Sequence, residues 1–140
     1  MIHIEVNRVH GEYGFEAKDS SGHIARMDTS HETGGDNFGI RPMQMLLMGL
    51  GGCSGIDIVS ILKKQRQTVE GFRMLIDGER QAGVEPSLWT DIHIIFELTG
   101  AIDPDKAYKA CALSVDKYCS VAATLKKGHA RITWEVKVNP

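Results

Sequence analysis

Two of the three cysteines of this chain, Cys53 and Cys119, are the residues best suited to chemistry. Cys53 lies in the most apolar stretch of the sequence, and Cys119 stands at the start of a later helical segment. A thiol becomes a nucleophile when it ionises, and a helix N-terminus or a nearby cation lowers its pKa from about 8.5. Ser120 is a predicted N-cap, so we expect the Cys119 sulfur near the positive end of a helix. The pair is therefore a candidate for thiol redox chemistry, against the alternative of inert buried cysteines.

The surroundings predicted for Cys53 and Cys111 favour a thiolate less than those of Cys119. Cys53 falls inside its predicted helix, where the helix dipole helps little and burial would raise its pKa, so it needs a cationic neighbour from elsewhere in the fold. Cys111 lies on the apolar face of another predicted helix, together with Ala107 and Val115. We expect Cys111 to be inert core.

No metal or cofactor is expected. The six histidines form no HxxxH or HExxH arrangement, and no pair of cysteines forms CxxC. The glycine-rich segment around Cys53 lacks the GxxxxGK[ST] pattern of a phosphate-binding loop. Hydrolysis by a cysteine, histidine and aspartate stays open as an alternative, without a local motif to support it.

The elements that would position the cysteines are predicted from hydrophobic periodicity. The segment from Pro42 to about Lys64 predicts a long helix with a basic C-terminal end. Asp103 and Pro104 are the predicted N-cap and first residue of a second helix that ends near Tyr118. Alternating apolar residues predict strands, and their order among the helices predicts an α+β fold with an antiparallel sheet in one domain, residues 1–140. Strands separated by turns are expected throughout residues 1–30, where Ile2, Ile4 and Val6 alternate with polar residues. Further strands are expected around 72–76, 92–98 and 134–138, and a short helix at 120–127.

The N-terminal half of the long helix is apolar on every face, so we expect it to be enclosed on all sides. Gly49, Gly51 and Gly52 each cost about 1 kcal/mol of helix propensity relative to alanine. Close approach of another helix or another subunit would explain them.

Composition narrows the class of protein. With 42% hydrophobic and 24% charged residues, the chain is typical of a soluble globular domain. A net charge of −2 gives no basic field, so we expect no nucleic-acid partner. Glycines and Asp57 interrupt the longest apolar run, which favours a buried helix over a membrane span. Because no signal peptide is recognised, the expected location is the reducing cytoplasm.

The segment RPMQMLLMGLGGCSGIDIV, followed much later by KYCSVAATL, resembles the OsmC/Ohr family of thiol peroxidases and is most similar to its OsmC-like redox proteins. Pro42, Gly49, the small pair Gly51-Gly52 and Cys53 match the family's first motif, and Cys119 matches its second cysteine. The resemblance implies an OsmC-like fold with an antiparallel sheet packed around long central helices in an intertwined homodimer. It also implies that Cys53 attacks a peroxide and that Cys119 then forms a disulfide with it, which a cellular dithiol reduces.

The chain departs from the family pattern beside the cysteine. The hydroperoxide reductases of the family have a glutamate ten residues before the reactive cysteine, and this glutamate holds an arginine over the sulfur. Met43 stands at that position here, with Gln44 next to it. Arg8 is the nearest candidate for the arginine. Arg26 and Arg41 are possible replacements.

Three hypotheses follow. The first is a cofactor-free thiol redox protein that reduces organic hydroperoxides through Cys53 and Cys119, with Gln44 and Arg8 in support. The second is a non-catalytic module of the same fold that binds a small apolar ligand at the dimer interface. The third is a structural dimer whose cysteines only pack.

Overall fold

The computed structural model describes residues 1–140 and contains two compact units, residues 1–46 and 47–140. A long helix, α1, runs from Pro42 to Lys64 and so contains the boundary between them. The bounds of α1 agree with those predicted. A single domain over residues 1–140 stays a prediction. The remaining elements are β1 (Ile4–His10), β2 (Gly14–Asp19), β3 (Ile24–Met27), η1 (His31–Thr33), β4 (Thr68–Arg80), β5 (Trp89–Ala101), α2 (Pro104–Leu113), η2 (Ser114–Tyr118), α3 (Ser120–Lys127) and β6 (Arg131–Val138).

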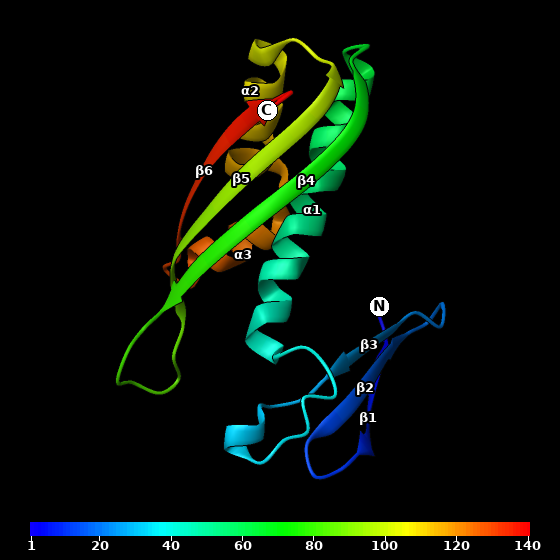
Figure 1. The fold of residues 1–140 in the computed structure, drawn as a ribbon, viewed down its shortest axis with the longest axis vertical. Helices are drawn as coiled ribbons and strands as arrows, with labels where there is room; N and C mark the ends of the chain where they lie inside the picture. The colour runs from blue at the N-terminus through cyan, green and yellow to red at the C-terminus, as the bar shows by residue number, and fades with distance from the viewer. The chain divides into compact units, whose positions relative to one another are not determined.

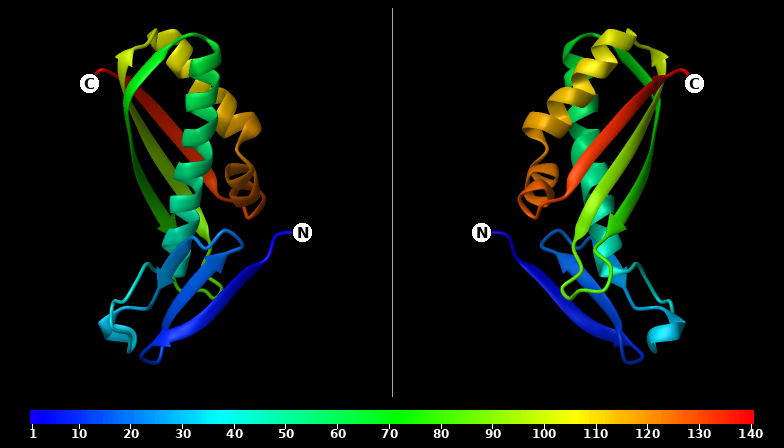
Figure 2. Two further views of the ribbon diagram at one scale, coloured as in Figure 1. Left: turned by 90° about the vertical axis from the view of Figure 1, so that its right-hand side faces the viewer. Right: turned by 90° about the vertical axis from the view of Figure 1, so that its left-hand side faces the viewer.

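The C-terminal unit is a sheet with helices on one face (Figures 1 and 2). The strand order is β4-β5-β6, and β5 is the central strand. Alternate residues of β5 are buried because successive side chains of a strand point to opposite faces. These residues, together with apolar positions of α1, form the core. They include Ile92, Ile94, Phe96, Leu98, Leu50, Ile58 and Leu62.

The sheet differs in one respect from the antiparallel sheet that was expected. β4 and β5 are antiparallel, but β5 and β6 are parallel. Parallel neighbours need a crossover connection long enough to return to the starting edge. Here the segment between β5 and β6 contains α2 and α3, which supply that crossover. The fold is therefore α+β as predicted, with two sheets and one parallel strand pair.

The N-terminal unit contains the second sheet, a small antiparallel one with strand order β1-β2-β3. A buried carboxylate, Asp28, fixes the loop that follows it by accepting hydrogen bonds from the backbone N–H groups of Thr29, Asp36 and Phe38. Burial favours the neutral acid, but the backbone donors outweigh it, so the pKa of Asp28 is lowered.

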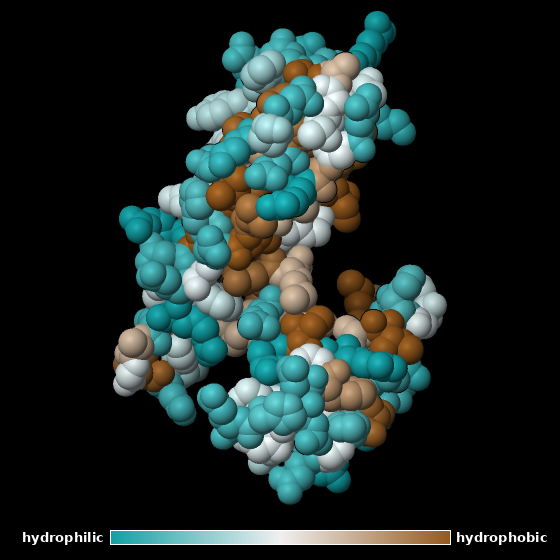
Figure 3. Space-filling model, in the orientation of Figure 1, coloured by the Kyte–Doolittle hydropathy of each residue, from teal (hydrophilic) through white to brown (hydrophobic).

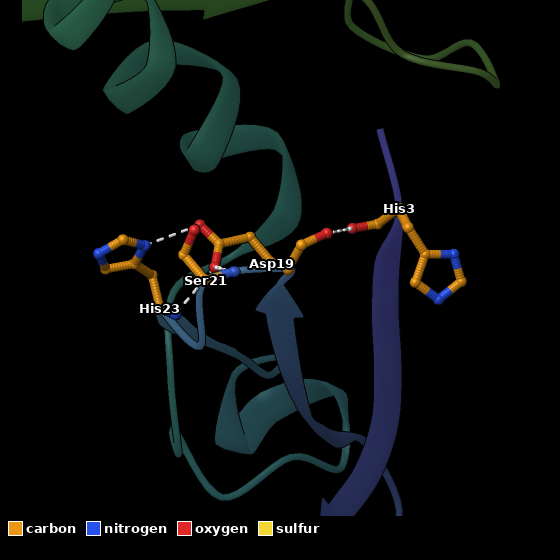
Figure 4. A network of polar contacts seen from close by, with 5 residues as sticks. His3, Asp19, Ser21 and His23 are labelled. Atoms are coloured by element: carbon orange, nitrogen blue, oxygen red, sulfur yellow. Dashed lines mark hydrogen bonds and ion pairs between the residues drawn. The ribbon is translucent and has the colours of Figure 1, made fainter. Parts of the chain in front are cut away.

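Histidines of this unit take part in ordinary surface contacts. In the turn after β2, the Asp19 carboxylate accepts from the backbone N–H groups of Ser21 and His23 and lies 2.8 Å from the His23 ring Nδ1 (Figure 4). The hydrogen bond from the His23 ring lowers the pKa of Asp19. The ring of His3 points away from this network in the same view (Figure 4). His3 and His23 are both exposed.

The long helix is not enclosed within a single chain. Only one side of α1 is buried, and this side packs on the sheet. A Cβ atom added at Gly51 would lie 3.0 Å from the Ile76 side chain, and one added at Gly55 would lie 2.9 Å from the Met74 side chain. These two glycines therefore allow approach of a strand rather than of a helix. Gly49 and Gly52 face open space. Apolar side chains reach the surface in both units (Figure 3).

By length and composition alone, α1 could cross a membrane, with a mean hydropathy of 1.8. The core helix of a soluble protein meets the same criterion. Leu50, Ile58 and Leu62 of α1 are fully buried within the chain, as expected for such a core helix.

Candidate functional site

The first part of the site lies on the side of α1 that is turned away from solvent. Cys53 and Asp57 are four residues apart, so they lie one above the other on the same helix face. Both are half-buried. The neighbouring Ser54 is fully buried and donates to the Leu50 carbonyl at 2.8 Å, which keeps its hydroxyl satisfied inside the helix.

Cys119 is positioned by a π-helical turn and by the start of a helix. The turn η2 continues α2, and the Cys119 N–H donates to the Ser114 carbonyl at 2.8 Å. Cys119 is itself the N-cap of α3, because its Sγ accepts a hydrogen bond from the Ala122 N–H at 3.4 Å. The prediction of Ser120 as the cap was wrong by one residue, since Ser120 is the first helical residue. The sulfur nevertheless lies at a helix N-terminus, as expected.

The two cysteines meet in space. The sulfurs of Cys53 and Cys119 and a carboxylate oxygen of Asp57 all lie within 4.8 Å of one another. All three cysteines of the chain are free thiols. Closing a disulfide between Cys53 and Cys119 requires the sulfurs to approach to about 2.0 Å. The short separation makes that a local movement.

A buried serine connects the two sides of the cluster. The Ser114 hydroxyl lies 3.0 Å from Asp57 Oδ2 and 3.3 Å from the Ser54 carbonyl oxygen of α1. Ser114 is fully buried. A buried hydroxyl with such partners holds its neighbours in place, since an unpaired acceptor would cost about 1–3 kcal/mol. Ser114 thus fixes the Asp57 carboxylate and links η2 to α1.

Burial dominates the ionisation of the thiols. It raises the pKa of Cys119 to about 11, and a hydrogen bond with Cys53 adds to the increase, although the Ala122 N–H acts in the opposite direction. The helix N-terminus is therefore too weak to make Cys119 a thiolate at neutral pH. Burial alone raises the pKa of Cys111 to about 12. Cys111 is fully buried in α2, in agreement with its predicted place in the core.

A groove of about 560 Å³ lies beside the cluster, and Asp57 is part of its wall. Ile61, Leu113 and Tyr118 give the groove apolar surface, while Lys64 contributes a cation. A small, mainly apolar molecule could reach Asp57 along it.

The supporting residues expected from the sequence lie in the N-terminal unit. Arg8 is exposed on β1, and Gln44 is exposed in the first turn of α1. Arg26 lies 3.5 Å from a Glu16 oxygen, and Arg41 donates to the Gly39 carbonyl. A role for Arg8 or Gln44 beside Cys53 stays a prediction.

Sequence reasoning missed Asp57 and Ser114. The spacing of Cys53 and Asp57 on one helix face could have indicated the carboxylate. No local signal could have indicated Ser114, because its partners come from a helix far away in the sequence.

Comparison with known proteins supplies the wider context. The profile of the family described as "OsmC-like protein" matches residues 34–135. Protein YhfA of Escherichia coli strain K12 is 43% identical over 114 residues, which cover 81% of each chain.

Two solved structures show the same fold. A hypothetical protein of Aquifex aeolicus VF5 has a TM-score of 0.82 and 31% identity, over 100% of this chain and 98% of that one. An organic hydroperoxide resistance protein OsmC of Legionella pneumophila has a TM-score of 0.72 and 18% identity, over 99% and 97% of the chains.

Proposed function

Because this chain belongs to the OsmC-like protein family, we propose that it is a thiol-dependent redox protein that reduces organic hydroperoxides with Cys53 as nucleophile and Cys119 as resolving cysteine. The observation that carries the proposal is the meeting of the two sulfurs within 4.8 Å, although they come from different helices. The name of the Legionella protein, which shares the fold, agrees with this chemistry.

In the first step, the Cys53 thiolate attacks one oxygen of the peroxide and the O–O bond breaks. Sulfur is oxidised by two electrons to a sulfenic acid, while the peroxide is reduced to an alkoxide that takes up a proton. Asp57 is the nearest carboxylate to Cys53 and can accept the proton of the thiol. Its hydrogen bond with Ser114 holds it in place for this role.

In the second step, the Cys119 thiolate attacks the Cys53 sulfur. An S–S bond forms, the S–O bond breaks, and hydroxide leaves as water after protonation. An external dithiol then reduces the disulfide and restores both thiols. Since burial raises the pKa of Cys119, this step is expected to be slower than the first at neutral pH.

The proposal also covers the substrate, the oligomeric state, the cellular location and the supporting residues. The substrate class is a small, mainly apolar peroxide, which the groove beside Asp57 would accommodate. The working form is a homodimer in the cytoplasm, in which Arg8 and Gln44 would support Cys53 in place of the glutamate that Met43 replaces. The apolar residues exposed on α1 favour association with a second copy.

A second candidate function is non-catalytic binding of a small apolar ligand. The replacement of the family's glutamate by Met43 and the raised pKa of Cys119 favour it, because both oppose fast thiol chemistry. Native mass spectrometry of freshly purified protein would detect a ligand retained in the apolar groove. A groove that is always empty would argue against this function.

The test uses single-turnover oxidation of the reduced protein by cumene hydroperoxide, with peptide mapping. We expect a rapid Cys53–Cys119 disulfide in the wild type and a loss of peroxide reduction of at least about a thousandfold in Cys53→Ser. Cys119→Ser should accumulate a sulfenic acid that dimedone traps at Cys53.

Cys111→Ser is the matched control, because Cys111 is the third thiol and lies outside the cluster. It should form the same disulfide as the wild type. Full peroxide reduction by Cys53→Ser, or slow oxidation of all three cysteines alike, would exclude the peroxidase function.

A further inference from the structure

The cluster of Cys53, Asp57 and Cys119 brings together three groups that all become anions when they ionise. The ion pairs of the chain do not include Asp57. Asp57 accepts a hydrogen bond from the neutral hydroxyl of Ser114. Each additional negative charge in the cluster repels the others, and burial of Cys119 makes this repulsion stronger. A cation bound between the three groups would attract each of them and so favour their ionised forms.

We propose that Cys53, Asp57 and Cys119 bind one soft divalent cation of the Zn²⁺ type in the reduced protein. Two thiolates and a carboxylate are ligands of zinc, whereas Mg²⁺ and Ca²⁺ prefer sites made of oxygen alone. The inference does not depend on the peroxide reaction, because binding needs the thiols and the carboxylate only.

The distances are compatible with such a site. Zinc binds sulfur at about 2.3 Å and carboxylate oxygen at about 2.0–2.2 Å, so tetrahedral geometry places ligand atoms about 3.5–3.8 Å apart. The three ligand atoms of the cluster lie within 4.8 Å of one another. A modest contraction by side-chain rotation is sufficient. Three protein ligands leave the fourth position for water or another molecule.

The neighbours of the three ligands already have the contacts that metal ligands usually need. Ser114 donates to Oδ2 of Asp57, which leaves Oδ1 available for a metal. The Ala122 N–H donates to the Cys119 sulfur and would stabilise it as a thiolate. Such hydrogen bonds orient ligands and tune their basicity in metal sites.

Metal binding must release protons, which gives a signature independent of any substitution. Zinc binds cysteine as the thiolate, so a thiol gives up its proton when it becomes a ligand. We expect protons to be released when Zn²⁺ is added to the reduced protein, measured with a pH indicator in weakly buffered solution.

The experiment titrates the reduced, metal-free full chain with Zn²⁺ in competition with a chromophoric chelator, and with Co²⁺ as a spectroscopic probe. We expect one metal ion per chain, tetrahedral Co²⁺ bands and thiolate-to-cobalt charge transfer. Cys53→Ser and Cys119→Ser should each weaken Zn²⁺ binding at least about a hundredfold, and Asp57→Asn about tenfold.

Matched controls separate this site from general thiol binding. Cys111→Ser and Asp116→Asn remove a thiol and an exposed carboxylate outside the cluster and should leave the Zn²⁺ affinity unchanged. Circular dichroism establishes that each variant is folded. Equal Zn²⁺ affinity in wild type and Cys53→Ser, or the absence of charge transfer in wild-type protein with Co²⁺, would overturn the proposal.

The outcome is distinguishable from that of the peroxidase test. The titration contains no peroxide, so the metal site can be established or excluded whether or not Cys53 reduces peroxides. If both activities exist, bound Zn²⁺ should slow the oxidation of Cys53 by cumene hydroperoxide, and a chelator should restore the rate. Oxidation at an unchanged rate under saturating Zn²⁺ would contradict binding through Cys53.

Discussion

At the scale of single residues, burial and hydrogen bonding act against each other on the cysteines. Cys119 lies at the N-terminus of α3 and receives a hydrogen bond from the Ala122 N–H, both of which favour the thiolate. Its side chain is only 2% exposed, and desolvation of the charged form outweighs both effects. Cys111 has burial without any compensating donor, and its pKa is raised further. The surroundings of each thiol therefore set its reactivity.

The raised pKa of Cys111 predicts a loss of stability in alkali. Below the ordinary thiol value of 9.0, Cys111 is protonated in both the folded and the unfolded state and has no effect on the pH dependence. Between 9.0 and about 12, the unfolded chain loses this proton while the folded chain keeps it. The free energy of unfolding should then fall with rising pH, with a contribution that approaches about 1.4 kcal/mol per pH unit.

Urea unfolding of wild type and Cys111→Ala over this pH range measures the effect. The alanine variant should be less stable at neutral pH, because it leaves a small cavity, but its stability should fall less steeply in alkali. Val115→Ala is the control, since it truncates a buried side chain without removing a titratable group. Identical slopes in wild type and Cys111→Ala would show that Cys111 ionises in the folded protein as easily as in the unfolded chain.

At the scale of elements, local signals predicted some parts of the site and not others. The bounds of α1 followed from Pro42 at its start and the basic residues at its end, and these are local features. The π-helical turn η2 could not be predicted, because long-range contacts hold it. Ser114 hydrogen-bonds to α1, and Lys126 of α3 donates to the Val115 carbonyl at 2.7 Å. The parallel pairing of β5 with β6 was missed for the same reason.

The contact of Lys126 with η2 predicts an effect on disulfide formation. Lys126→Met keeps most of the side-chain volume but removes the hydrogen bond to the Val115 carbonyl and the 3.7 Å ion pair with Asp116. We expect a loss of about 1 kcal/mol in stability, because the site is partly exposed. The turn that precedes Cys119 should become more mobile, so the Cys53–Cys119 disulfide should form several times more slowly.

Stopped-flow oxidation with cumene hydroperoxide separates the two chemical steps. Lys126→Met should leave the formation of the Cys53 sulfenic acid unchanged and slow only its conversion to the disulfide. Lys127→Met removes a neighbouring exposed lysine and is the matched control. An equal effect of the two substitutions would mean that general charge, rather than the contact with η2, controls the rate.

At the scale of the whole molecule, α1 has an apolar face that no part of the chain covers. Met48 is 53% exposed and Ile56 is 74% exposed, although both belong to a helix rich in apolar residues. A groove beside this face is lined by Gly52, Gly55 and Phe72 among others. Gly52 has no neighbour within 4 Å of the position that a Cβ would occupy. Small residues beside exposed apolar ones are the features expected where another helix packs closely, and the homodimer proposed for the working form would supply that helix.

Substitution of Ile56 by glutamate tests this arrangement. Ile56→Glu places a charge at the centre of the exposed apolar face, and a homodimer formed through this face would bury two such charges, one from each copy. Because burying an unpaired charge costs several kcal/mol, the variant should be monomeric at concentrations where the wild type is dimeric. Val84→Glu introduces the same charge at an apolar residue that is 51% exposed in the β4–β5 connection and should leave the dimer intact. Sedimentation velocity gives the masses directly. A wild type that sediments as a monomer, or an Ile56→Glu variant that remains dimeric, would mean that α1 is not the surface through which two copies associate.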